Sequence, residues 1–213
     1  MQRGLSRVEV VTVILAVLVI LFVFVLPVSD RRRHASKHRL ENASRIRGIQ
    51  QSLIQFAQDN NQLYPGLGPE EVLTASGRLQ LLLDRSLLTP EYLVSPLEFD
   101  KVPAEGTVTT GNFSHCLLEI GPSASGRRAE WTTTARSDAP VVFDRNVATE
   151  TGAGARSIHS TSDWRGSIGF NDGHVDFKNT NVFATQFGIQ INSIDDLFVD
   201  ERDDGANALG AYD

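Results

Sequence analysis

The feature that most constrains this chain is an apolar run near its amino terminus, from Val10 to Val28. Only Thr12 and Pro27 interrupt its apolar character. As a helix, a run of this length would reach across a bilayer core roughly 30 Å thick. No small-x-small cleavage site follows it, so a removable signal peptide is not indicated. The sequence therefore predicts a transmembrane helix over residues 5–28.

Charge is distributed unevenly along the chain. Residues 1–50 carry nine Lys and Arg and three Asp and Glu, whereas residues 51–213 carry eleven and twenty-three. Because the long C-terminal part is acidic, no nucleic-acid partner is expected. Basic residues flank the apolar run on both sides, and their count alone favours a cytoplasmic C-terminal part. Cys116 is the only cysteine, which excludes an internal disulfide and a cysteine-based zinc site.

Beyond Pro27 the pattern stays helical and becomes amphipathic. Apolar residues recur every three or four positions at Leu40, Ala43, Ile46, Ile49, Leu53 and Phe56. The sequence therefore predicts that residues 29–60 extend the first helix. The turn-forming residues that follow, including Pro65 and Gly66, predict its end.

The rest of the chain predicts a globular α+β head over residues 61–200, followed by an acidic tail over residues 201–213. The leucine-rich stretch 79–88 favours a short helix. Residues 114–120 and 139–144 favour strands. We expect the tail to fray after Arg202, because it is acidic and terminal.

A β-hairpin is the strongest local prediction, over Gly166–Lys178. Asp172 and Gly173 lie between two alternating apolar runs, which is typical of a two-residue turn. That turn would set Phe170 opposite Val175 and Ile168 opposite Phe177, with all four side chains on one face.

The segment "RGLSRVE" before the apolar run resembles the class III signal of type IV prepilins and type II secretion pseudopilins. The resemblance implies that a prepilin peptidase cleaves between Gly4 and Leu5 and methylates the new amino terminus. Glu9 would then be the fifth residue of the mature chain, paired with the amino terminus of a neighbouring subunit. The family usually has Phe where this chain has Leu5, and an apolar residue where it has Arg7.

The hairpin sequence "FNDGHVDF" is similar to the C-terminal end of pilin-like proteins of planctomycete-type bacteria, which carry an H-X9-DG motif. The matching positions are Asp172, Gly173 and His174, with His159 as the candidate histidine. Twelve residues separate His159 from Asp172 instead of nine. A structural role for His159, bonding near the hairpin, is the favoured interpretation.

The two resemblances imply a structural subunit rather than an enzyme. It would have a pilin-like α+β fold, with the long N-terminal helix packed on a head that contains an antiparallel sheet. The subunit would sit in the bacterial cytoplasmic membrane by a single pass, with its head on the extracytoplasmic side. It would polymerise through its N-terminal helix, alone or with other pilin-like subunits, in type II-like protein secretion. Its partners would include prepilin peptidase and an inner-membrane assembly platform. The alternative is a single-pass anchored binding or sensory domain that never polymerises.

Catalytic chemistry is not indicated. His159, Asp172, His174 and Asp176 could form a metal or acid–base cluster, but no HExxH motif or phosphate-binding loop accompanies them. The pseudopilin resemblance implies one further site, for calcium, which prefers several oxygen ligands. Its candidate ligands are Asp195, Asp196, Asp200, Asp203 and Asp204. A solvated acidic tail is the alternative interpretation of these residues.

Overall fold

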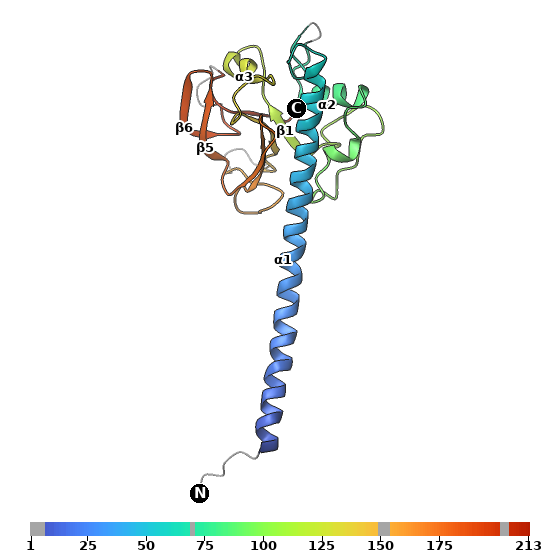
Figure 1. Cartoon of the computed structure of the whole chain (residues 1–213), viewed down its shortest axis with the longest axis vertical. Coiled ribbons are helices and arrows are strands. Elements are labelled where there is room, and N and C mark those ends of the chain that lie inside the picture. The colour runs from blue at the N-terminus through green and yellow to red at the C-terminus, as the bar shows by residue number, and fades with distance from the viewer. Residues whose placement is uncertain (1–6, 69–70, 149–153, 201–204) are drawn as a thin grey trace. The chain divides into compact units, whose positions relative to one another are not determined.

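The computed structural model describes residues 7–68, 71–148, 154–200 and 205–213, apart from the side chains of Glu9 and residues 21–35. The chain divides into two compact units, Met1–Leu40 and Glu41–Asp213. Helix α1 (Arg7–Gln58, 52 residues) contributes to both units. Everything else in regular structure belongs to the second unit, called the head below (Figure 1).

The described part of the chain contains no helix with the length and apolar character that a membrane crossing needs. The predicted fold class, a pilin-like protein with a transmembrane first half, is therefore wrong. The predicted single-pass location in the bacterial inner membrane is wrong for the same reason.

The head is built on a five-stranded antiparallel sheet in the order β4-β3-β2-β1-β7. Its strands are β1 (His115–Leu118), β2 (Pro140–Asp144), β3 (Gly166–Phe170), β4 (Val175–Lys178) and β7 (Gly210–Ala211). A separate two-stranded sheet pairs β5 (Val182–Phe187) with β6 (Gln190–Asp196). Three short helices complete the head, α2 (Ala75–Asp84), η1 (Pro90–Leu93) and α3 (Ser125–Glu130).

The C-terminal turns of α1 lie against one face of the five-stranded sheet. A side chain added at Gly169 would meet Ile46 and Gln50 of the helix within 2.8 Å. Gln50 also donates a 2.6 Å hydrogen bond to the carbonyl of Phe170. Ile46, Ile49 and Leu53 of α1 are fully buried in the core. The amphipathic stripe of the helix therefore supplies one layer of the core, and the sheet supplies the other.

Residues from late in the chain cover the opposite face of the sheet. The ring of Phe143 lies 6.1 Å from that of Phe198, and the ring of Trp164 lies 5.8 Å from it. Trp164 is almost fully buried, although it lies outside the strands. The sheet is therefore buried on both faces, which explains why every residue of β1, β2 and β3 is buried.

The β3–β4 hairpin forms where the sequence predicts it, but its predicted register is wrong by one residue. Gly169 pairs with Val175, and Ser167 pairs with Phe177. The loop has three residues, because Phe170 exchanges backbone hydrogen bonds with Gly173 and His174. Gly173 has a φ of +87°, the left-handed residue of a type I turn with a bulge. The extra residue moves the side chains of β4 to the other face relative to β3.

The predicted fraying of the tail is wrong for the described residues 205–213. Gly210 and Ala211 pair with β1 at the edge of the sheet. The Asp213 carboxylate accepts hydrogen bonds from the backbone N–H groups of Ala75 (2.5 Å) and Ser76 (2.8 Å) at the start of α2. An acidic group at a helix amino terminus is favourable, so the acidic end of the tail caps α2.

Replacement of Gly169 by alanine tests the contact between α1 and the sheet. The added methyl group would lie 2.7–2.8 Å from Gln50 and Ile46, so the helix must shift outward. We expect the free energy of unfolding, measured by chemical denaturation, to fall by about 1–3 kcal/mol. Gly154→Ala is the matched control, because no atom lies within 4 Å of that added methyl group. Equal stability of both variants would contradict close helix–sheet packing at Gly169.

Candidate functional site

The centre of the head contains a buried carboxylate, that of Asp144 at the end of β2. Asn42 of α1 donates hydrogen bonds to both of its oxygens, at 2.8 and 3.1 Å. The backbone N–H of Ser167 in β3 donates to Oδ2 at 2.7 Å. One side chain therefore connects helix α1, β2 and β3 across the layer between helix and sheet.

Two histidines approach the same carboxylate. The Nε2 atom of His159 lies 3.1 Å from Oδ2 of Asp144, and Nδ1 of His115 lies 3.3 Å from Oδ1. The side chains of both histidines are at most 3% exposed. Within the described part of the chain, the ring nitrogens of His115 have no partner in hydrogen-bond geometry. We call Asn42, His115, Asp144 and His159 the Asp144 cluster.

The surroundings of Asp144 favour its ionised form. Burial by itself raises the pKa of a carboxyl group. The neighbouring rings of His115 and His159 outweigh that effect and hold the pKa of Asp144 below its ordinary range. Because the carboxylate is completely buried, a substrate has no access to it. The arrangement can hold elements together, but it is unsuited to acid–base catalysis.

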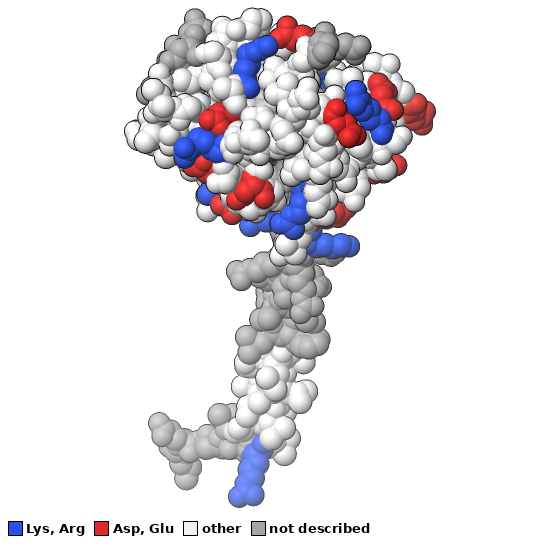
Figure 2. Space-filling model, turned by 45° about the horizontal axis from the view of Figure 1, so that its top comes forward, with Lys and Arg blue, Asp and Glu red and all other residues white. Residues whose placement is uncertain are grey.

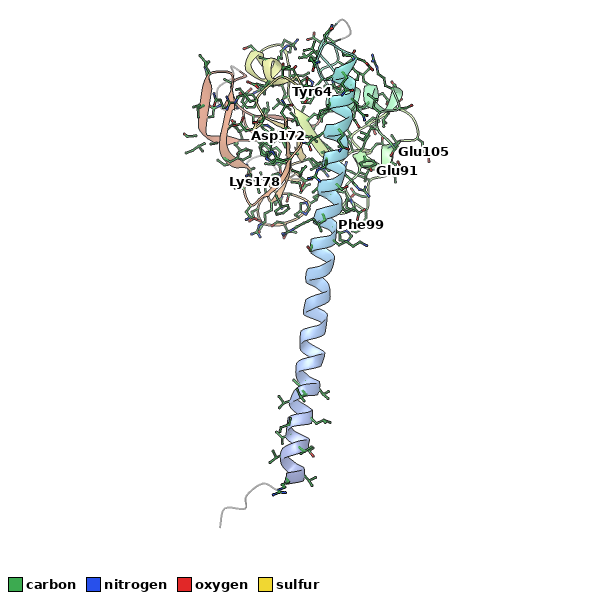
Figure 3. All side chains as sticks on the ribbon, viewed as in Figure 1. Tyr64, Glu91, Phe99, Glu105, Asp172 and Lys178 are labelled. Carbon is green, nitrogen blue, oxygen red and sulfur yellow. The ribbon has the colours of Figure 1, made fainter. Side chains whose placement is uncertain are left out.

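The structure separates the residues of the predicted hairpin motif into two places. His159 belongs to the buried Asp144 cluster, and its ring meets the edge of Phe177 in β4, with centroids 5.2 Å apart. Asp172 lies at the exposed hairpin tip, where its carboxylate accepts a 3.0 Å hydrogen bond from the backbone N–H of His174 (Figure 3). The His174 ring stacks on Phe170 at a centroid distance of 4.4 Å.

His159 therefore touches the hairpin through Phe177 and not through the Asp172–Gly173 turn. Asp172, Gly173 and His174 close the turn, and Asp176 pairs with Lys178 at 3.0 Å on the exposed strand. The side-chain cluster of His159, Asp172, His174 and Asp176 that could act as an acid–base group is not formed. Across the described ranges, no three His, Cys, Asp or Glu side chains gather in a group able to hold a metal ion.

The acidic residues considered as calcium ligands have other roles where they are described. Asp195 is buried and accepts a 2.8 Å hydrogen bond from the N–H of Ala208. Asp196 accepts a 2.7 Å bond from the side chain of Asn181. Asp200 pairs with Arg127 at 3.3 Å. These bonds hold the C-terminal segment to the head. Asp203 and Asp204 lie outside the described residues.

The predicted processing and assembly residues lie at the other end of the chain. Gly4 and Leu5 are outside the described residues. Glu9 belongs to α1, but its side chain is outside the described set. The residues that follow it along α1 are described up to Ile20, and their large apolar side chains are exposed.

Family models, curated proteins and solved structures were compared with the chain, and none matches it. The Asp144 cluster is thus understood from its geometry alone. Sequence reasoning missed three of its members, Asn42, His115 and Asp144. A signal for Asn42 was present, because it falls on the apolar stripe of Ile46, Ile49 and Leu53. A polar residue on such a stripe needs a buried partner.

Acid denaturation tests the Asp144 cluster. A carboxyl group with a lowered folded-state pKa adds stability above its unfolded pKa of about 4, and loses it as the pH falls through the folded value. We expect Asp144→Asn to cost about 3 kcal/mol at pH 7 and to flatten the loss of stability below pH 4. Urea denaturation at several pH values measures both effects.

Asp138→Asn is the control for this experiment, because Asp138 is an exposed carboxylate paired with Arg136. It should leave the stability at pH 7 within about 0.5 kcal/mol of the parent value. It should also keep the acid-dependent loss. A variant of Asp144 that retains the full loss below pH 4 would show that this carboxylate is not its source.

Proposed function

We propose that this chain is a structural subunit of a pilus-like or pseudopilus-like assembly. It is processed by a prepilin peptidase between Gly4 and Leu5 and polymerises through the N-terminal half of α1. The observation that carries the proposal is the exposure of apolar side chains over residues 8–20 of that helix. Their exposed fractions run from 42% to 75% at Val8, Val10, Val11, Val13, Ile14, Leu15, Val17, Leu18, Val19 and Ile20.

These side chains point in every direction around the helix. Consecutive residues of an α-helix are turned by about 100°, so Val10, Val11, Val13 and Ile14 cannot share one face. A helix that is apolar all round is stable in water only when it is covered. Side-by-side packing with the same segment of other copies supplies cover on all sides, which a single docking partner does not. The apolar area available per copy corresponds to a gain on the order of 10 kcal/mol before the costs of association.

Glu9 explains how such helices would be aligned. A carboxylate within an apolar helix is costly unless it is paired. Cleavage after Gly4 would create a positive amino terminus at Leu5, and that amine on a neighbouring copy is a suitable partner. A copy packed at the wrong height would leave the carboxylate unpaired. The partners that follow are prepilin peptidase, an assembly platform and further pilin-like subunits.

Mass spectrometry of the amino terminus tests the processing step. In cells that contain a prepilin peptidase, we expect the mature chain to begin at Leu5 with one added methyl group. Gly4→Val should block both changes, because the peptidase then lacks its small residue at the cleavage site. A native chain that begins at an unmodified Met1 would contradict processing.

Variation of Glu9 tests the alignment. Glu9→Gln removes the charge with little change in size, so we expect processing to continue and sedimentable assemblies to decrease at least ten-fold. Glu105→Gln, an exposed carboxylate of the head, is the matched control and should assemble normally (Figure 3). Normal assembly of the Glu9 variant would contradict the pairing. A chain that never sediments in either form would instead be a binding domain that does not polymerise.

A further inference from the structure

The β5–β6 hairpin presents three isoleucines outward. Ile189, Ile191 and Ile194 are 96%, 68% and 69% exposed. The same hairpin turns polar side chains inward, since Thr185 and Asn192 are at most 5% exposed. Figure 1 shows this sheet on the flank of the head opposite α2. The inner side of the hairpin also holds the buried ring of Phe187, so the isoleucines form a second apolar face that the head leaves uncovered.

Buried polar bonds hold the hairpin in this orientation. Thr185 donates its hydroxyl proton to the carboxylate of Asp195, which also accepts from the N–H of Ala208 at 2.8 Å. Asn192 donates to the carbonyl of Ala206. At the turn, the N–H of Gly188 donates to Glu130 of α3 at 2.9 Å. Since the inward side is tied to two other segments, the isoleucines cannot turn into the core by a roll of the hairpin.

A β-bulge contributes to the outward face. Phe183 pairs with Asp195 and Thr185 pairs with Asn192, so the register shifts between them. Two consecutive residues, Ser193 and Ile194, are thereby both exposed. Bulges commonly redirect a side chain and disturb pairing at a strand edge. The isoleucine face is thus better suited to face-to-face packing than to the addition of another strand.

The charge pattern indicates what can cover this face. Residues 179–194 contain no Lys, Arg, Asp or Glu, although residues 51–213 carry twelve more acidic than basic residues. Figure 2 shows the basic and acidic side chains on one face of the head. Two copies of an acidic head repel each other except where neither presents a charge. A basic partner would be drawn to the carboxylates elsewhere on the head.

We propose that the isoleucine face of the β5–β6 hairpin packs against the same face of a second copy. Ile189, Ile191 and Ile194 form this self-complementary contact. Three side chains bury less area than a stable dimer needs, about 1,200 Å² in total. The contact therefore rests on the proposed function, because assembly through α1 raises the effective concentration of the heads.

Disulfide trapping in the full-length chain tests the contact. Ile191→Cys places a thiol on the face, and the native Cys116 is buried and does not compete. Under mild oxidation we expect a covalent dimer to form at least ten-fold faster than with Val102→Cys. Val102 is a suitable control, since it is apolar and 62% exposed on another segment of the head. Equal rates for the two variants would overturn the contact.

A second variant tests whether dimer formation depends on the isoleucine face or only on the exposure of the thiol. In the Ile194→Cys background, Ile191→Lys should slow dimer formation at least ten-fold while the far-ultraviolet circular dichroism stays unchanged. An unchanged rate would overturn the contact. If Ile191→Cys forms sedimentable assemblies but no covalent dimer, the contact is overturned and the proposed function stays intact. If the same variant forms the covalent dimer but never forms large assemblies, the contact is supported and the proposed function is overturned.

Discussion

The architecture of the head depends on one buried carboxylate. Asp144 accepts hydrogen bonds from Asn42 in α1 and from the backbone of Ser167 in β3, and two histidines lie beside it. A buried charge is costly unless its oxygens are satisfied. The buried carboxylate is therefore stable only when α1, β3 and the loop that bears His159 are all folded around it. Together with the hydrogen bond from Gln50 to Phe170, the cluster adds polar contacts to a layer that is otherwise apolar.

The geometry around this carboxylate also accounts for the shape of the hairpin. Ser167 can offer its N–H to Asp144 while Phe177, opposite it, packs against His159. Both contacts need the register that the three-residue turn with Gly173 provides. In the two-residue register, Phe177 would lie opposite Ile168 and on the face away from His159. The three-residue turn is therefore required for the contacts that β3 and β4 make with the Asp144 cluster.

The two units of the chain carry their apolar surface differently. In the head, the large aromatic side chains of Trp131, Trp164 and Phe143 are fully or almost fully buried. Over residues 8–20 of α1, the apolar side chains are exposed on every side. In the proposed assembly, neighbouring copies bury the apolar side chains of the helix, whereas the core of the head buries its own. The uncharged isoleucine face adds a second, weaker contact where acidic heads approach each other.

The local elements of this protein could be predicted because their causes are local. The spacing of Ile46, Ile49 and Leu53 predicts the helix, and Asp172 with Gly173 predicts the turn. The bond between Asn42 and Asp144 could not be predicted, since the two residues are 102 positions apart. Likewise, nothing in the sequence indicated that Asp213 would cap α2 or that β7 would close the sheet.

The membrane-spanning prediction was wrong, because no helix in the described part of the chain has the length and apolar character that a crossing needs. By itself, the sequence determined where helix and turns form, through periodicity and backbone preference. The tertiary structure alone decided the hairpin register, the place of His159 and the outward turn of the isoleucines. Each of these depends on buried polar groups finding partners far away in the chain, which no local pattern encodes.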